Sequence, residues 1–128
     1  MTRKTFSTDS DFENMAGYSR ALVQDNWCFV SGTTGYDYTT MFMPLDIQTQ
    51  TQNCIETIRQ TLENAEFALS DIVRANYYVT KKSDAELAFS VLGKAFASIR
   101  PAATMIVCGL IRPEMLIEIE VTALKSTT

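Results

Sequence analysis

At 128 residues, the chain is near the modal length of a single domain, long enough for one hydrophobic core and too short for two. Its residues are 46% apolar and 20% charged, which is typical of a compact globular protein and excludes a disordered or fibrous one. Eleven basic and fifteen acidic side chains give a net charge of -4, which repels phosphate backbones and argues against nucleic acid as a partner. We therefore expect residues 1–128 to form one domain.

The sequence lacks a targeting or membrane-spanning segment and also lacks histidine, and these absences limit the expected location and chemistry of the protein. Residues 1–14 are polar and lack the apolar centre of a signal peptide, and no apolar run reaches membrane-spanning length. The three cysteines, Cys28, Cys54 and Cys108, are odd in number and lie among apolar neighbours, which predicts buried reduced thiols in a cytoplasmic protein. The chain has no histidine, so it has no Ser-His or Cys-His nucleophile pair and lacks the commonest metal ligand. We expect neither a metal nor a cofactor, and any proton transfer must use the remaining side chains, backbone groups or water.

The first predicted elements are a β-hairpin and a long helix. Residues 21–23 and 27–31 have the composition of strands, and the polar residues 24–26 between them predict a turn. After Asp46, apolar residues recur every three or four positions as far as Ala65. This spacing predicts an amphipathic helix with Asp46 as its N-cap.

A strand and a second helix are expected next. Residues 72–79 are rich in β-branched and aromatic side chains, which predicts a central strand. Ser83 is followed three residues later by Glu86, the pattern of a capped helix start. We expect this helix to end at Arg100-Pro101, because the residue before a proline is disfavoured in helical conformation.

The last two predicted strands are 104–108 and 115–124, and the second of them carries two acids. Because side chains alternate along a strand, Glu118 and Glu120 share one face, about 7 Å apart. Alternation of apolar and acidic residues is also ordinary where one sheet face meets water. The alternative is that one carboxylate lies in a cleft. The small residues 31–35 contain two glycines but no lysine of a phosphate-binding loop, and they predict a strand end and a turn.

The complete order is ββαβαββ. This order predicts an α+β fold, with a mixed or antiparallel sheet and both helices packed on one face. The other face would then be covered by a second copy of the chain, because it carries Tyr, Met and the paired Glu side chains. A homo-oligomer is the expected state.

Six short motifs occur in an order that identifies a family. They are Gly17-Tyr18, Val30-Ser31-Gly32, Gln52-Asn53, Asp71-Ile72-Val73, Arg100-Pro101-Ala102 and Ile117-Glu118-Ile119-Glu120. Over about residues 17–124 the chain resembles the Rid/YjgF family of reactive-intermediate deaminases, also known as the endoribonuclease L-PSP family. The resemblance implies a chorismate-mutase-like fold and a homotrimer whose clefts lie between neighbouring subunits.

The resemblance also implies roles for individual residues. Glu120 matches the family acid that orients or activates water, and Tyr18 matches a cleft tyrosine that hydrogen-bonds substrate. Ser31 and Gly32 match the floor of the cleft, and Met105 occupies the position whose backbone carbonyl helps to hold the water. Solvent exposure for Glu120, and packing at a subunit contact for Tyr18, are the alternatives.

Two cleft positions depart from the family pattern. An arginine that grips the substrate carboxylate in the best-characterised branch is Ala103 here, and an asparagine of the cleft is Phe89. A two-pronged arginine contributes two charge-assisted hydrogen bonds of about 1.5–3 kcal/mol each, so its loss should weaken use of a 2-imino acid by about a hundredfold or more. Thr104 is a candidate substitute polar contact.

Arg20, Arg100 and Arg112 are the available replacement cations, with surface charge as the alternative interpretation of each.

Three functions follow from the resemblance. The first is hydrolysis of an enamine or imine C=N bond of a small metabolite, with a non-standard substrate because Ala103 replaces the arginine. The second is binding of a small metabolite, without chemistry, by a trimer on the same scaffold. Endoribonuclease activity is the third, and the negative net charge and missing histidine weigh against it. An aminomuconate-type deaminase activity, which also occurs in the family, stays open.

Overall fold

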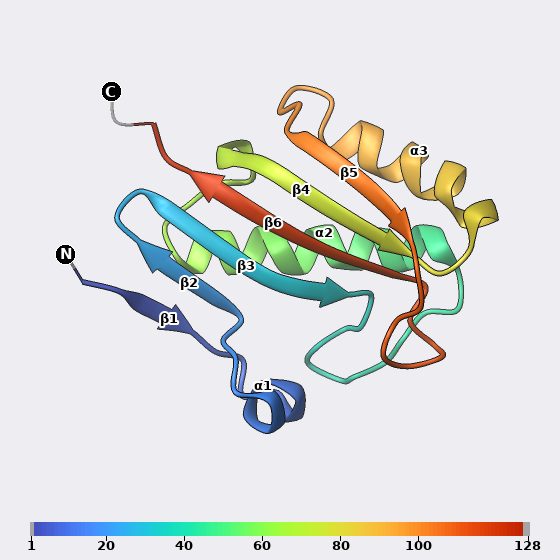
Figure 1. Cartoon of the computed structure of the whole chain (residues 1–128), viewed down its shortest axis with the longest axis horizontal. Coiled ribbons are helices and arrows are strands. Elements are labelled where there is room, and N and C mark those ends of the chain that lie inside the picture. Colours follow the sequence, from blue (N-terminus) through green and yellow to red (C-terminus); the bar gives the residue numbers. More distant parts are fainter. Residues whose placement is uncertain (1, 127–128) are drawn as a thin grey trace.

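The computed structural model describes residues 2–126 and contains one six-stranded sheet (Figure 1). The strands are β1 Lys4–Phe6, β2 Ala21–Gln24, β3 Trp27–Thr34, β4 Ile72–Val79, β5 Ala102–Val107 and β6 Ile117–Leu124. The helices are α1 Asp11–Ala16, α2 Ile47–Asn64 and α3 Ala85–Ala95, with short 3-10 turns η1 Leu69–Asp71 and η2 Lys82–Asp84. From β2 onward the order is the predicted ββαβαββ.

The sheet is mixed, with strand order β1-β2-β3-β6-β4-β5. Only β4 and β5 run parallel among these neighbours, and the crossover between them contains α3. Helices α2 and α3 lie on one side of the sheet (Figure 1), so the predicted α+β architecture is confirmed. No helix among residues 2–126 has both the length and the apolar character needed to cross a membrane.

Strand β6 shows why the two faces of the sheet differ. Its residues alternate strictly: Ile117, Ile119, Val121 and Ala123 are buried, whereas Glu118, Glu120 and Thr122 are partly exposed. The apolar set packs against α2, because period-2 alternation places every second side chain on the helix-covered face. The open face carries the two acids, together with the stacked rings of Trp27 and Phe29, whose centroids are 6.1 Å apart.

Local signals explain most of the helix boundaries. The Asp46 carboxylate accepts a hydrogen bond from the Thr49 amide at 2.9 Å, so the predicted N-cap of α2 is confirmed. The predicted cap at Ser83 is wrong. Ser83 lies inside η2, and α3 begins after Asp84, whose side chain makes no capping bond.

The structure adds β1 and α1 to the elements that the sequence predicts. The polar N-terminal segment forms an edge strand on β2 and then a short helix, in which Ser10 caps the Glu13 amide at 3.2 Å. Glu13 is buried, and its carboxylate accepts hydrogen bonds from Ser7 and Thr8. These bonds outweigh burial and lower the pKa of Glu13. Side-chain bonds of this kind order a segment that has little apolar surface to bury.

Candidate active site

A hollow on the open face of the sheet contains three of the residues that the sequence singles out. We call it the Glu120 hollow. It has a volume of about 450 Å³ and is lined by Gly17, Tyr18, Ser19, Leu22, Phe29, Val30, Ser31 and Glu120. Tyr18 comes from the segment before β2, Ser31 from β3 and Glu120 from β6, so the fold joins residues that are far apart in the sequence.

A second hollow lies on the other side of the sheet. We call it the Ala103 hollow. Its volume is about 430 Å³, and its lining is Tyr77, Phe89, Leu92, Gly93, Phe96, Ala97, Arg100, Pro101 and Ala103. It lies between α3 and β5. Phe89 and Ala103 therefore line one hollow, and Glu120 lines the other, on the opposite side of the sheet.

Strand register explains this separation. Ala103 pairs with Ala75 and Met105 with Tyr77, and both partners are buried on the helix side. Thr104 instead pairs with Asn76, which pairs with Glu120 on the open face. Thr104 is thus in line with Glu120, about 10 Å away at the usual spacing of two strands.

Tyr78 holds the Glu120 carboxylate. Its hydroxyl donates a hydrogen bond to Glu120 Oε1 from the neighbouring strand β4. This bond is the main cause of a rise in the pKa of Tyr78 to about 12, since a carboxylate acceptor favours the protonated phenol. Tyr78 is in register with Glu118, yet it donates diagonally to Glu120. The contact fixes the orientation of one of the two acids.

Glu118 has a different environment. Its Oε2 would lie 2.1 Å from a Cβ built on Gly32, so the carboxyl group occupies the space that a side chain would fill there. Burial raises the pKa of Glu118, and neighbouring Glu120 adds to the rise, whereas Arg20 opposes it. No residue among those described donates a hydrogen bond to this carboxyl group.

Arg20 is buried, and the surface-charge interpretation of it is wrong. Only 3% of the residue is exposed. Its Nη2 donates to the backbone oxygens of Ser31 and Gly32, each at 2.6 Å, while its Nε has no partner within residues 2–126. These bonds hold the strand where the pairing of β3 with β6 shifts register, between Val30 and Thr33. Arg20 positions the floor of the Glu120 hollow and is not free to grip a substrate.

The other predicted residues are placed as follows. The Ser31 hydroxyl donates to the Ser19 carbonyl at 2.6 Å, which ties β3 to the segment carrying Tyr18. Tyr18 is 40% exposed. Its pKa is raised, chiefly by burial of the phenol, and Arg20 opposes the rise. Arg112 stacks over the Phe12 ring, 4.9 Å from its centroid, outside both hollows.

Comparison with known proteins identifies the family. The sequence profile of the endoribonuclease L-PSP family matches residues 8–125. The chain belongs to this family. Rv2704 of Mycobacterium tuberculosis, a member of the YjgF/YER057c/UK114 family, is 36% identical with a TM-score of 0.89, over 97% of this chain and 100% of that one.

Solved structures of lower sequence identity share the fold. NMB1025 of Neisseria meningitidis, a YjgF family protein, is 23% identical with a TM-score of 0.83 and covers all of this chain and 98% of its own. The Rid family protein YyfA of Yersinia pestis is 21% identical with a TM-score of 0.86, over 97% of this chain and 100% of that one. The YjgF-like fold expected from the sequence is therefore confirmed.

Two structural features of the Glu120 hollow were not predicted from the sequence. Tyr78 as the partner of Glu120 is a diagonal contact, which depends on side-chain direction across two strands. The burial of Arg20 depends on the register shift in β3. Gly32 was the available signal for the second feature, because a glycine inside a strand often marks a bulge or a close approach. Residues 2–126 contain no cluster of acids and cysteines that could hold a metal ion.

Proposed function

We propose that the protein hydrolyses an imine or enamine C=N bond of a small metabolite, with Glu120 activating the water. The observation that carries the proposal is the Glu120 hollow. It combines a carboxylate oriented by Tyr78, a serine, an exposed tyrosine and enough volume for a small substrate. Ser31 and Tyr18 supply hydroxyl groups at its wall, and both can hydrogen-bond a polar ligand.

The reaction needs a base for water and a route for the proton to nitrogen. Glu120 takes a proton from water, the oxygen bonds to the imine carbon, and the C=N electron pair moves to nitrogen, which takes a proton. The resulting carbinolamine then releases ammonia and leaves a carbonyl. Imine and water thus give ketone and ammonia, and atoms balance without a redox step. The diagonal bond from Tyr78 keeps Glu120 turned toward one side of the hollow.

A homotrimer is part of the proposal. The Glu120 hollow and the Ala103 hollow lie on opposite sides of the sheet, so one subunit cannot bring Glu120 and Ala103 to the same substrate. The β5 strand is at the end of the sheet, where a neighbouring subunit has access to it. The exposed Trp27 and Phe29 rings on the open face support such contacts. Sedimentation as a stable monomer at micromolar concentration would contradict this assembly.

The substrate differs from a simple 2-imino acid in this proposal. Ala103 offers no cation, and Phe89 makes the same hollow more apolar. Of the three arginines considered as replacements, only Arg100 lines the Ala103 hollow. Arg20 is buried near the other hollow, and Arg112 stacks on Phe12. A substrate carboxylate bound by Arg100 would lie in a different orientation from one bound by an arginine at position 103.

Binding of a metabolite without chemistry is the second candidate. The loss of the arginine at Ala103 favours it, since the main electrostatic handle for a carboxylate is missing. We also propose a cytoplasmic location, supported by the unpaired thiols of Cys28, Cys54 and Cys108.

Hydrolysis assays with three variants test the proposal. The substrates are enzymatically generated 2-iminobutanoate and 2-iminopropanoate, at equal protein concentration. Glu120→Gln removes the base and Ala103→Arg restores the cation. Glu63→Gln is the matched control, because it changes an exposed carboxylate on α2, across the sheet from the hollow. The control should behave as the native protein.

The outcomes separate the candidates. Native activity that Glu120→Gln abolishes means that the chemistry operates with another carboxylate grip. Activity that appears only in Ala103→Arg means an intact water-activating cleft with a different natural substrate. Inactivity of every variant, with folding and assembly intact, would favour the binding function. Equal activity of Glu120→Gln and the native protein would remove Glu120 from the mechanism.

A further inference from the structure

A pocket at one end of the sheet lies between α1 and two connections, residues 35–46 between β3 and α2 and residues 108–116 between β5 and β6 (Figure 1). We call it the Arg112 pocket. Its volume is about 540 Å³, which is in the range of small-molecule sites. It shares no lining residue with the Glu120 hollow or the Ala103 hollow, so the proposed hydrolysis does not account for it.

Aromatic rings and thioethers form much of the wall of the Arg112 pocket. Phe12 comes from α1, whereas Tyr36 and Tyr38 come from the connection before α2. The two tyrosine rings stand edge to face, with centroids 6.0 Å apart and an angle of 69° between their planes, so they form a corner. Met15 and Met41 add two polarisable side chains. Because the face of an aromatic ring attracts positive charge, such a wall favours a cationic ligand.

The side chain of Arg112 shows where a cation lies in this pocket. Its guanidinium carbon is 4.9 Å from the centroid of the Phe12 ring. Arg112 forms no ion pair with any carboxylate of residues 2–126, although Asp9, Asp11 and Glu114 line the same pocket. The arginine is exposed, so it can leave the ring for solvent at little cost. The face of Phe12 is therefore a cation position that the protein fills with an exchangeable side chain of its own.

The charge of the lining selects the class of ligand. Three acidic side chains and one basic one give a balance of −2, which disfavours an anion. An alkylated ammonium ion offers charge to the rings and methyl groups to the apolar wall. We propose that the Arg112 pocket binds a small alkylated ammonium ion of the choline type, over the face of Phe12 and in place of the Arg112 guanidinium. A phosphate on the ligand would be repelled by the acids, so the free ion fits better than a phosphocholine head group.

Hydrogen bonds hold the walls of the pocket in place. The Tyr36 hydroxyl donates to the Glu114 carboxylate at 2.5 Å, which joins the two connections directly. Gln50 of α2 is buried and donates to the carbonyl oxygens of Pro44 and Glu114, at 2.7 and 3.0 Å. Its side-chain oxygen accepts a hydrogen bond from the Leu116 amide at 3.0 Å. Both connections are thus tied to α2, so a ligand need not order the pocket when it binds.

Binding of choline and of a neutral isostere tests the proposal. In the isostere, dimethylbutanol, a carbon atom replaces the ammonium nitrogen, so the shape is kept and the charge is lost. Choline should bind the native protein about tenfold more tightly than dimethylbutanol, because the rings attract its charge. NMR of methionine methyl groups locates the ligand: the signals of Met15 and Met41 should shift, and those of Met105 and Met115, which are outside the pocket, should not.

Two variants and one control test the role of the protein's own cation. Arg112→Gln removes the competitor and should tighten choline binding about two- to thirtyfold. Lys125→Gln is the matched control, because Lys125 Nζ lies 4.5 Å from the Phe67 centroid, so the same charge and a similar ring contact are lost outside the pocket. Its choline affinity should equal that of the native protein. Phe12→Leu, added to Arg112→Gln, keeps apolar volume but removes the ring and should cancel the gain.

Several results would overturn the proposal. Equal binding of choline and dimethylbutanol would mean that the pocket does not recognise charge. Equal gains in Arg112→Gln and Lys125→Gln would mean that only the net charge of the protein matters. Phosphocholine that binds as tightly as choline would contradict the role of the acids. The assay needs no turnover, so a protein that binds choline but hydrolyses no imine would refute the proposed function and support this inference.

Discussion

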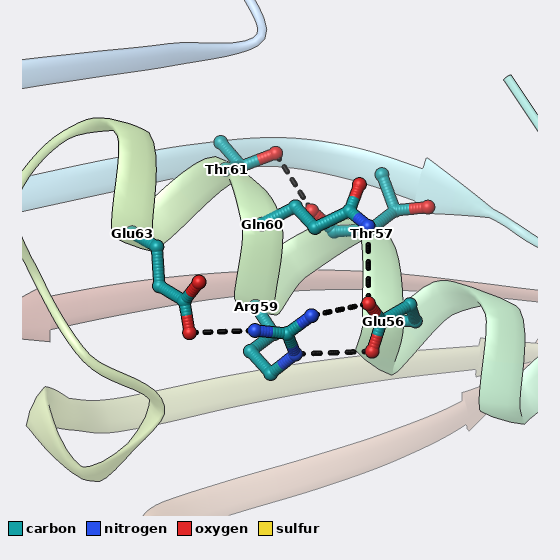
Figure 2. Close-up of polar contacts among 6 residues, drawn as sticks. All are labelled: Glu56, Thr57, Arg59, Gln60, Thr61 and Glu63. Atoms are coloured by element: carbon teal, nitrogen blue, oxygen red, sulfur yellow. Dashed lines mark hydrogen bonds and ion pairs between the residues drawn. The ribbon is translucent and has the colours of Figure 1, made fainter. Parts of the chain in front are cut away.

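Replacing Arg20 with methionine should destabilise the protein much more than the same replacement at Arg59, although only Arg59 forms ion pairs. Arg59 lies on α2 between Glu56 and Glu63 (Figure 2). Its contact with Glu63 measures 2.6 Å, but its side chain is 39% exposed and those of the two acids are 52% and 56% exposed. Such exposed pairs contribute about 0.2–1 kcal/mol each.

The expected loss at Arg20 follows from its two buried hydrogen bonds. Each runs 2.6 Å from a charged guanidinium to a backbone carbonyl, of Ser31 or Gly32, and is worth about 1.5–3 kcal/mol. Methionine keeps most of the apolar volume, and removing the unpartnered Nε returns about 1–3 kcal/mol. The net cost should be about 2–3 kcal/mol, against about 1 kcal/mol for Arg59→Met.

Urea unfolding of both variants at one protein concentration measures the difference, since assembly would make the midpoint depend on concentration. Equal losses, or a larger loss for Arg59→Met, would refute the reasoning. Such a result would mean that water satisfies the two carbonyl groups as well as Arg20 does.

Three further outcomes are expected. The free energy of unfolding should fall as pH rises from 4.5 through the raised pKa of Glu118, because the folded state binds more protons than the unfolded state in that range. Glu118→Gln should flatten this dependence on pH. Urea unfolding that shows the same dependence in Glu118→Gln would contradict the prediction. Asp46→Ala should lower the free energy of unfolding by about 0.5–2 kcal/mol, because it removes the N-cap of α2. Thermal unfolding of the variant and of the native protein measures this loss. A thiol reagent should modify Cys108 in the native protein and leave Cys28 and Cys54 intact until urea is added, because burial raises the pKa of Cys28 to about 11 and that of Cys54 as well.

An element of the fold was predictable from the sequence where hydrophobic periodicity and a capping or turn residue indicated the same structure. The alternation of Ile117 to Ala123 gave the correct buried face of β6, and the spacing after Asp46 gave α2 with its cap. The segment containing β1 and α1 was not predictable by these means. It is held by side-chain bonds to Glu13, and such bonds leave no hydrophobic period in the sequence.

The candidate site was predictable only in part. The resemblance to the family brought together Tyr18, Ser31 and Glu120, which line one hollow. Periodicity placed Glu118 beside Glu120 but gave no means of telling them apart, because the difference arises from Tyr78 and Gly32 on other strands. The separation of Ala103 from Glu120 likewise depends on the parallel register of β5, which no local pattern encodes.

The sheet order has a consequence for synthesis of the chain. Strand β6, formed by residues 117–124, lies between β3 and β4, so the last of these six strands to be made joins the two halves of the sheet (Figure 1). Until it leaves the ribosome, β3 and β4 have no partner on their facing edges, and the apolar side of α2 has only part of its surface covered. A nascent chain of this protein therefore has open strand edges until residues 117–124 have been made and have emerged from the ribosome. A premature stop before residue 117 would remove β6 from the middle of the sheet and leave β3 and β4 without their shared partner.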